Sequence, residues 1–165
     1  MGVWSGSIDG YDDRDLPMDN NEDGGYAATY HAGPDWSGPE GFYVRDFRKP
    51  MTPAESKTWV IYLWADPDIY DETRMTISVE AGAPVPPAER TYSLELLYVP
   101  DGISNAPPLG TTWELVVGET LMVEVPTYKT DNGLAGYQFA FTASAVPEPA
   151  SLRGLLGGRA LLRRR

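Results

Sequence analysis

The chain has 165 residues, which suits one domain, and its formal net charge at pH 7 is −11. Residues 1–145 carry 8 basic and 23 acidic residues, whereas the last 20 residues carry five Arg and one Glu. A body with a net charge of −15 excludes nucleic acid as a partner, because phosphate recognition needs clustered Lys and Arg. The absence of cysteine excludes disulfides, thiolate metal sites and cysteine nucleophiles.

The first segment, residues 1–25, contains seven acidic residues and a single Arg among turn-forming residues. We expect an irregular acidic loop there. The first residues show no basic region followed by an apolar stretch, which a secretory leader requires. A leader for export must therefore precede Met1 or have been removed.

Strand patterns occupy the region from residue 26 to residue 145. Aromatic residues between Gly and Pro breaks predict short strands near 26–31 and 41–47. Residues 58–64 are apolar on both faces, as in a central strand that is buried on both sides. Alternation of apolar and polar residues predicts further strands near 75–81, 92–98, 113–117, 121–125 and 137–143.

Turn signals separate these strands. Gly118-Glu119 predicts a two-residue type II′ hairpin turn, and Asn132-Gly133 marks another turn. Many short strands, frequent turns and no long helix are typical of an all-β domain. The sequence therefore predicts an antiparallel, jelly-roll-like β-sandwich over residues 26–145.

The chain ends in a tail, residues 146–165, that has three parts in order. The first part is a box, Val146-Pro147-Glu148-Pro149-Ala150, and a stretch rich in Leu and Gly follows it. The last part is the cluster Arg163-Arg164-Arg165. This tail resembles the PEP-CTERM sorting signal, which consists of such a box, an apolar helix and a terminal Arg cluster.

The resemblance implies an exported protein of a Gram-negative bacterium, placed in the cell envelope or the extracellular matrix. It also implies a partner, the integral-membrane protease exosortase, which recognises the box and processes the tail. The prolines keep the box extended, and the Arg cluster holds the end of the chain on the cytoplasmic side. Arg153 and Arg159 interrupt the apolar stretch, and each costs about 2.5–3.5 kcal/mol near a bilayer centre.

The acidic segment contains a motif, residues 19–24, that is similar to the first half of a calcium-binding loop. Oxygen ligands at its first, third and fifth positions are Asp19, Asn21 and Asp23. Tyr30 stands where the bidentate Glu is expected, so Asp12, Asp13 and Asp15 would have to complete the shell. The alternative is a solvated acidic turn without metal, and a bound cofactor is otherwise not expected.

Several other residues allow both a functional and a structural interpretation. Trp4, Trp36 and Tyr43 are candidates for stacking on sugar rings, or else they pack the sandwich. His31 is the sole histidine, which excludes a multi-histidine metal site, and we expect it at the surface or in a strand.

The loop after residue 64 holds a second acidic group, Asp66, Asp68, Asp71 and Glu72. Paired carboxylates catalyse glycoside hydrolysis, although these four also suit an ordinary connecting loop.

Three hypotheses remain from the sequence. The leading one is an exported, non-enzymatic β-sandwich displayed at the surface or in the matrix. The second is a carbohydrate-binding module for extracellular polysaccharide, steadied by Ca²⁺. The third is a small glycan-active hydrolase, which requires a cleft with two carboxyl groups about 5–10 Å apart.

Overall fold

The computed structural model describes residues 2–3, 9–18, 25–52, 55–69, 71–80 and 90–145. The first strands are β1 (Gly2–Val3), β2 (Leu16–Pro17), β3 (Gly25–His31), β4 (Gly41–Arg45), β5 (Phe47–Arg48) and β6 (Ser56–Ala65). They are followed by β7 (Arg74–Glu80), β8 (Arg90–Tyr98), β9 (Thr112–Leu115), β10 (Thr120–Pro126), the short 3-10 helix η1 (Gly133–Ala135) and β11 (Tyr137–Ala145). No helix within these ranges is long and apolar enough to cross a membrane.

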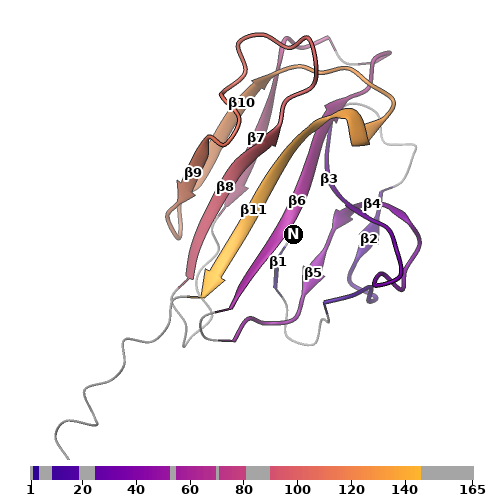
Figure 1. The fold of residues 1–165 in the computed structure, drawn as a ribbon, viewed down its shortest axis with the longest axis vertical. Coiled ribbons are helices and arrows are strands. Elements are labelled where there is room, and N and C mark those ends of the chain that lie inside the picture. Colours follow the sequence, from indigo (N-terminus) through magenta and orange to yellow (C-terminus); the bar gives the residue numbers. More distant parts are fainter. Residues whose placement is uncertain are drawn as a thin grey trace, which may run out of the picture.

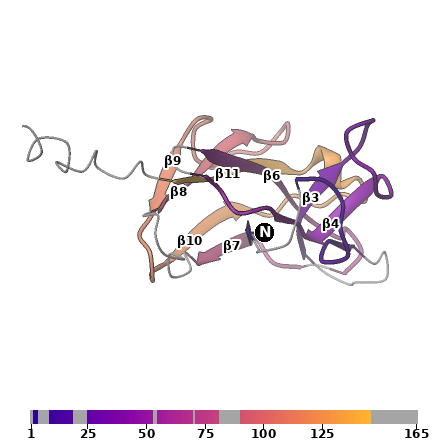
Figure 2. The same cartoon turned by 90° about the horizontal axis from the view of Figure 1, so that it is seen from below.

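The strands form two packed layers, which confirms the predicted all-β sandwich. The larger sheet has seven strands in the order β2-β4-β3-β6-β11-β8-β9, and its pairs are antiparallel. The smaller sheet consists of β10 and β7 (Figure 1). Figure 2 shows β7 and β10 lying across one side of the sheet that contains β8, β11 and β6. The predicted acidic loop contributes two very short strands, because β1 pairs with β5 and β2 pairs with β4.

The core lies between the two sheets and follows from the alternation of side chains along each strand. The larger sheet contributes, among others, Trp59, Ile61, Leu63, Leu94, Leu96, Tyr137, Phe139 and Phe141. The smaller sheet contributes Met75, Ile77, Val123 and Val125. The opposite side of the larger sheet, called the outer face below, faces away from β7 and β10.

Strand β6 is buried on both faces only at its end, which corrects the prediction for residues 58–64. Thr58 is exposed and Val60 is 37% exposed on the outer face, whereas Trp64 on the same face is 3% exposed. The difference arises because nothing described covers the outer face near Val60, while aromatic side chains and a loop cover Trp64.

The predicted hairpin at Gly118-Glu119 is wrong, although a turn is present there. Gly118 has a φ of +84°, and the Glu119 N–H donates to the Val116 carbonyl at 3.0 Å. Strand β9 pairs with β8 in the larger sheet, whereas β10 pairs with β7 in the smaller one. The turn therefore carries the chain from one layer to the other. The prediction failed because strands on both sides of such a corner alternate between apolar and polar residues in the same way as the strands of a hairpin.

Candidate functional site

Five aromatic side chains gather on the outer face of the larger sheet, close to the end of β6. They are Tyr26 and Tyr30 from β3, Phe42 from β4, and Tyr62 and Trp64 from β6. The sheet register brings them together, because Tyr26 lies opposite Trp64 and Tyr30 lies opposite Phe42. We call this group the outer aromatic cluster.

The rings of the cluster are in direct contact. The Phe42 and Trp64 ring centroids are 4.7 Å apart, and those of Tyr26 and Trp64 are 5.1 Å apart. Tyr30 and Tyr62 meet Phe42 edge to face. Trp64 is buried, whereas the other four rings are half-buried. The indole of Trp64 therefore lies behind neighbouring rings, which keep part of their surface in contact with solvent.

A cavity of about 380 Å³ opens beside this cluster. Its lining residues are Met18, Tyr26, Phe42, Trp64, Asp66, Thr130, Asp131 and Gly133. The volume lies within the range of about 300–1,000 Å³ that is usual for small-molecule sites. Aromatic rings with a small number of polar groups are also the usual composition of such sites. We call it the aromatic cavity.

The loop that carries Thr130 and Asp131 is tied to the end of β6. The Ala65 N–H donates to the Tyr128 carbonyl at 2.9 Å, and the Thr130 N–H donates to the Ala65 carbonyl at 3.0 Å. The Asn132 side chain caps η1 by accepting from the Leu134 N–H at 3.2 Å. These bonds place the polar side of the cavity on a fixed part of the backbone.

Gly133 sits directly against two rings of the cluster. A Cβ atom at this position would lie 2.7 Å from ring atoms of both Phe42 and Trp64, which is closer than packed atoms approach. Glycine is therefore needed for the loop to close over the indole. The Asn132-Gly133 pair was recognised in the sequence as a turn, but its packing role depends on the tertiary structure.

The second acidic group is divided between two places. Asp66 lines the aromatic cavity, and its Oδ1 accepts from the Asp68 N–H at 2.8 Å. Asp71 and Glu72 line a separate, more open hollow, where Asp71 lies 3.8 Å from the Lys129 ammonium. No cluster of three or more His, Asp or Glu side chains suited to a metal ion occurs among the residues that the structure describes.

Tyr43 does not offer a ring face to a sugar, which corrects the prediction for this residue. It is 1% exposed, and its hydroxyl donates to the Pro39 carbonyl at 2.7 Å. Trp36 is half-buried and stacks on His31, with ring centroids 3.8 Å apart and an interplanar angle of 8°. One face of this indole is therefore occupied. Trp4 lies outside the described residues.

His31 has a buried partner that the sequence did not reveal. Its Nε2 lies 2.8 Å from an oxygen of Asp46, and the guanidinium of Arg48 lies 3.5 Å from the same oxygen. Burial raises the pKa of Asp46, but the hydrogen bond with His31 and the charge of Arg48 outweigh it, so the pKa is lowered overall. Arg48 also lies over the Trp59 ring at 4.9 Å and so connects this group to the core.

The expected calcium ligands Asp19, Asn21 and Asp23 lie outside the described residues, as does the tail from Val146 to Arg165. Two of the neighbouring aspartates accept hydrogen bonds within their own turn. The Asp12 N–H donates to the Asp15 carboxylate, and the Arg14 N–H donates to the Asp12 carboxylate, each at 2.9 Å. Both carboxylates thus have a structural role in this turn.

Comparison with known proteins found no matching family model, no matching curated protein and no matching solved structure. What the aromatic cavity can bind therefore follows from its own geometry and chemistry. It combines half-buried rings, two carboxylates and a loop held by backbone hydrogen bonds.

Proposed function

We propose that this chain is an exported, non-enzymatic β-sandwich protein that is displayed at the bacterial surface and binds a saccharide in the aromatic cavity. One observation carries the binding half of this proposal: the half-buried rings of Tyr26 and Phe42 line the same cavity as the carboxylates of Asp66 and Asp131. A sugar ring has an apolar face of C–H groups and a rim of hydroxyls. Aromatic rings pack against the face, and carboxylates accept hydrogen bonds from the rim.

Binding without hydrolysis is favoured by the setting of the two carboxylates. The general acid of a glycosidase is a carboxyl group in an apolar, desolvated environment. Asp131 is exposed, and Asp66 is partly exposed and accepts a backbone hydrogen bond. These groups are suited to holding hydroxyls in place rather than to donating a proton to a leaving group.

Display at the surface is supported by the tail, in which the Pro-Glu-Pro box, the Leu-rich stretch and the Arg cluster follow one another. The resemblance of this tail to a PEP-CTERM signal implies processing by an exosortase. A saccharide-binding domain fits such a location, because extracellular polysaccharide is available there.

The binding proposal is tested by calorimetric titration of the full chain with a panel of oligosaccharides. We expect saturable binding that Phe42→Ala weakens about tenfold, equivalent to about 1.4 kcal/mol, through loss of the ring face. Trp36→Ala is the matched control, because Trp36 stacks on His31 and does not line the cavity. Phe42 also packs on Trp64, so circular dichroism checks that Phe42→Ala still folds. The isosteric Asp66→Asn variant is measured as well, because it alters the cavity without removing a packed ring.

Two results would contradict this proposal. One is the absence of binding by the full chain to every saccharide in the panel. The other is an equal loss of affinity in the Phe42→Ala and Trp36→Ala variants, which would place the ligand outside the aromatic cavity.

The display proposal is tested by expressing the full chain behind a cleavable leader in a Gram-negative host that has an exosortase. We expect the protein in the envelope fraction, with a mass reduced by loss of the tail. Replacing Pro147, Glu148 and Pro149 by Ala should prevent processing, whereas Ser151→Ala should not. Processing that is unchanged by the triple replacement would show that the box is not a sorting signal.

A further inference from the structure

The groups that line the aromatic cavity offer negative charge and hydrogen-bond acceptors. Its lining includes the carboxylates of Asp66 and Asp131, and no Lys or Arg is among its described lining residues. The nearest lysine along the loop, Lys129, lies beside Asp71 at the other hollow. The Thr130 hydroxyl, which also lines the cavity, accepts from the Asn132 N–H at 3.0 Å. A ligand in this cavity therefore meets hydrogen-bond acceptors, which favours a ligand that carries hydrogen-bond donors.

This charge balance distinguishes between classes of saccharide. An acidic sugar would bring a carboxylate, sulfate or phosphate beside two carboxylates, on a domain whose residues 1–145 carry a net charge of −15. Like charges within one cavity repel, and none of the described lining residues carries a positive charge that would compensate. A cationic group gains charge-assisted hydrogen bonds, which are roughly twice as strong as neutral ones.

The arrangement of the rings determines whether they surround a cationic group of the ligand or pack against another part of it. In an aromatic cage, rings surround the cation and each ring turns its face towards it. Here the rings touch one another, with centroids 4.7 Å apart for Phe42 and Trp64 and 5.1 Å apart for Tyr26 and Trp64. Such contacts leave no space for an ammonium group between Trp64 and either neighbouring ring. Tyr26 and Phe42, each packed on Trp64, line the aromatic side of the cavity, called the ring wall below. A flat ligand that packs on this wall extends its charged group to the carboxylates.

We infer that the ligand of the aromatic cavity is an amino sugar with a free ammonium group, an inference that rests on the proposed saccharide binding. The pyranose face packs on Tyr26 and Phe42, and the ammonium donates to Asp66 and Asp131. The cavity volume of about 380 Å³ suits one sugar unit or a short segment of a saccharide chain.

The inference is tested by titrating the full chain at pH 6 with four disaccharide probes and one small amine. The disaccharides are built of glucosamine, N-acetylglucosamine, glucose and glucuronic acid, and the amine is ethanolamine. We expect the glucosamine probe to bind about tenfold more tightly than either neutral disaccharide. We expect no detectable binding of the glucuronic acid probe or of ethanolamine, because the first is repelled and the second lacks a ring.

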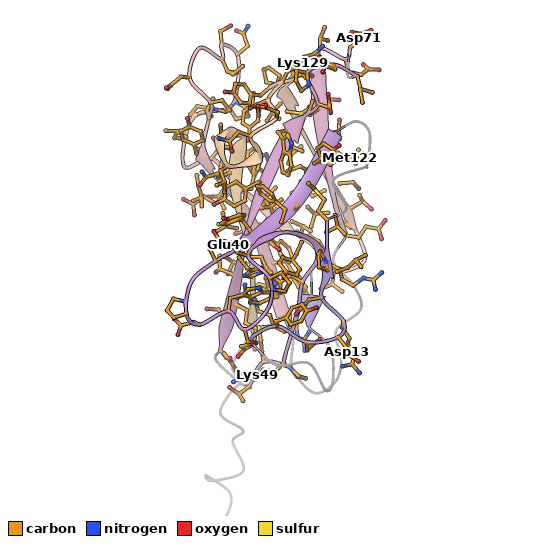
Figure 3. All side chains as sticks on the ribbon, turned by 90° about the vertical axis from the view of Figure 1, so that its right-hand side faces the viewer. Asp13, Glu40, Lys49, Asp71, Met122 and Lys129 are labelled. Carbon is orange, nitrogen blue, oxygen red and sulfur yellow. The ribbon has the colours of Figure 1, made fainter. Side chains whose placement is uncertain are left out.

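Variants locate the charge recognition. Asp131→Asn removes an exposed charge with little effect on folding, and Asp66→Asn keeps the oxygen that accepts from the Asp68 N–H. Each should reduce the preference for glucosamine over glucose about threefold or more. Asp13→Asn is the control, because Asp13 is exposed at the end of the molecule away from Lys129 (Figure 3). It should leave the preference unchanged.

The outcomes distinguish the amino-sugar inference from the proposed saccharide binding on which it rests. Neutral and amino disaccharides of equal affinity, both weakened by Phe42→Ala, would overturn the amino-sugar inference and leave the saccharide site in place. Binding of ethanolamine as tightly as the glucosamine probe would overturn the role of the ring wall. An absence of binding by all four disaccharides would overturn the proposed function itself.

Discussion

Replacing Phe139 by Ala is expected to lower the free energy of unfolding by about 3–5 kcal/mol. The side chain is 0% exposed and lies on β11, which hydrogen-bonds to β6 on one side and β8 on the other. Its ring lies near those of Trp113 and Tyr137. Removing the ring leaves a cavity that three strands of the larger sheet and the opposite layer cannot easily fill, because protein cores are closely packed.

The measurement is a urea denaturation curve followed by tryptophan fluorescence and by circular dichroism. Leu97→Ala is the matched control, since Leu97 is on the neighbouring strand β8 but is 41% exposed. Its effect should stay within about 0.5 kcal/mol, as for most surface substitutions. A loss of less than about 1 kcal/mol for Phe139→Ala would mean that the two layers do not pack around this ring as described.

Replacing Asp46 by Asn is expected to destabilise the fold by about 1.5–3 kcal/mol at neutral pH. The carboxylate is buried, and its partners are the imidazole of His31 at 2.8 Å and the guanidinium of Arg48 at 3.5 Å. The amide preserves the shape and an acceptor oxygen but removes the charge that both partners contact. Asp35→Asn is the control, because Asp35 is an exposed residue of the loop between β3 and β4.

The same variant should change the dependence of stability on pH in acid. The folded-state pKa of Asp46 is lowered from its ordinary value of 3.8, because the pull of His31 and Arg48 exceeds the opposing effect of burial. The stabilisation is therefore complete above about pH 3.8 and is lost as the pH falls through the lowered value. The difference in unfolding free energy between the natural chain and Asp46→Asn should shrink over that window. A difference that stays constant from pH 7 to about pH 2 would show that Asp46 does not titrate as described.

Alternation along the chain was sufficient to identify most strands, because it depends only on the residue types within a short segment. Residues 75–81 and 137–143 alternate as half-buried strands do, and the structure has strands at Arg74–Glu80 and Tyr137–Ala145. The class of the fold followed from many such strands. Which strands pair did not follow, because hydrogen bonding between backbones is almost independent of side chains. For this reason the alternation around Gly118 predicts a hairpin, whereas the structure has a corner between the two layers there.

The candidate site depended on the tertiary structure for a similar reason. Tyr26, Phe42 and Trp64 belong to three different strands, and each looks like an ordinary core residue in its own segment. Only the register that places Tyr26 opposite Trp64, and the order β4-β3-β6, brings their rings to one cavity.

The contact of His31 with Asp46 likewise joins residues that no local pattern relates. The sequence by itself determined that the domain consists of short alternating strands and that the tail resembles a sorting signal. Both features depend only on the residues within a short segment. The aromatic cavity and the contact of His31 with the buried Asp46 were decided by the packing of distant strands.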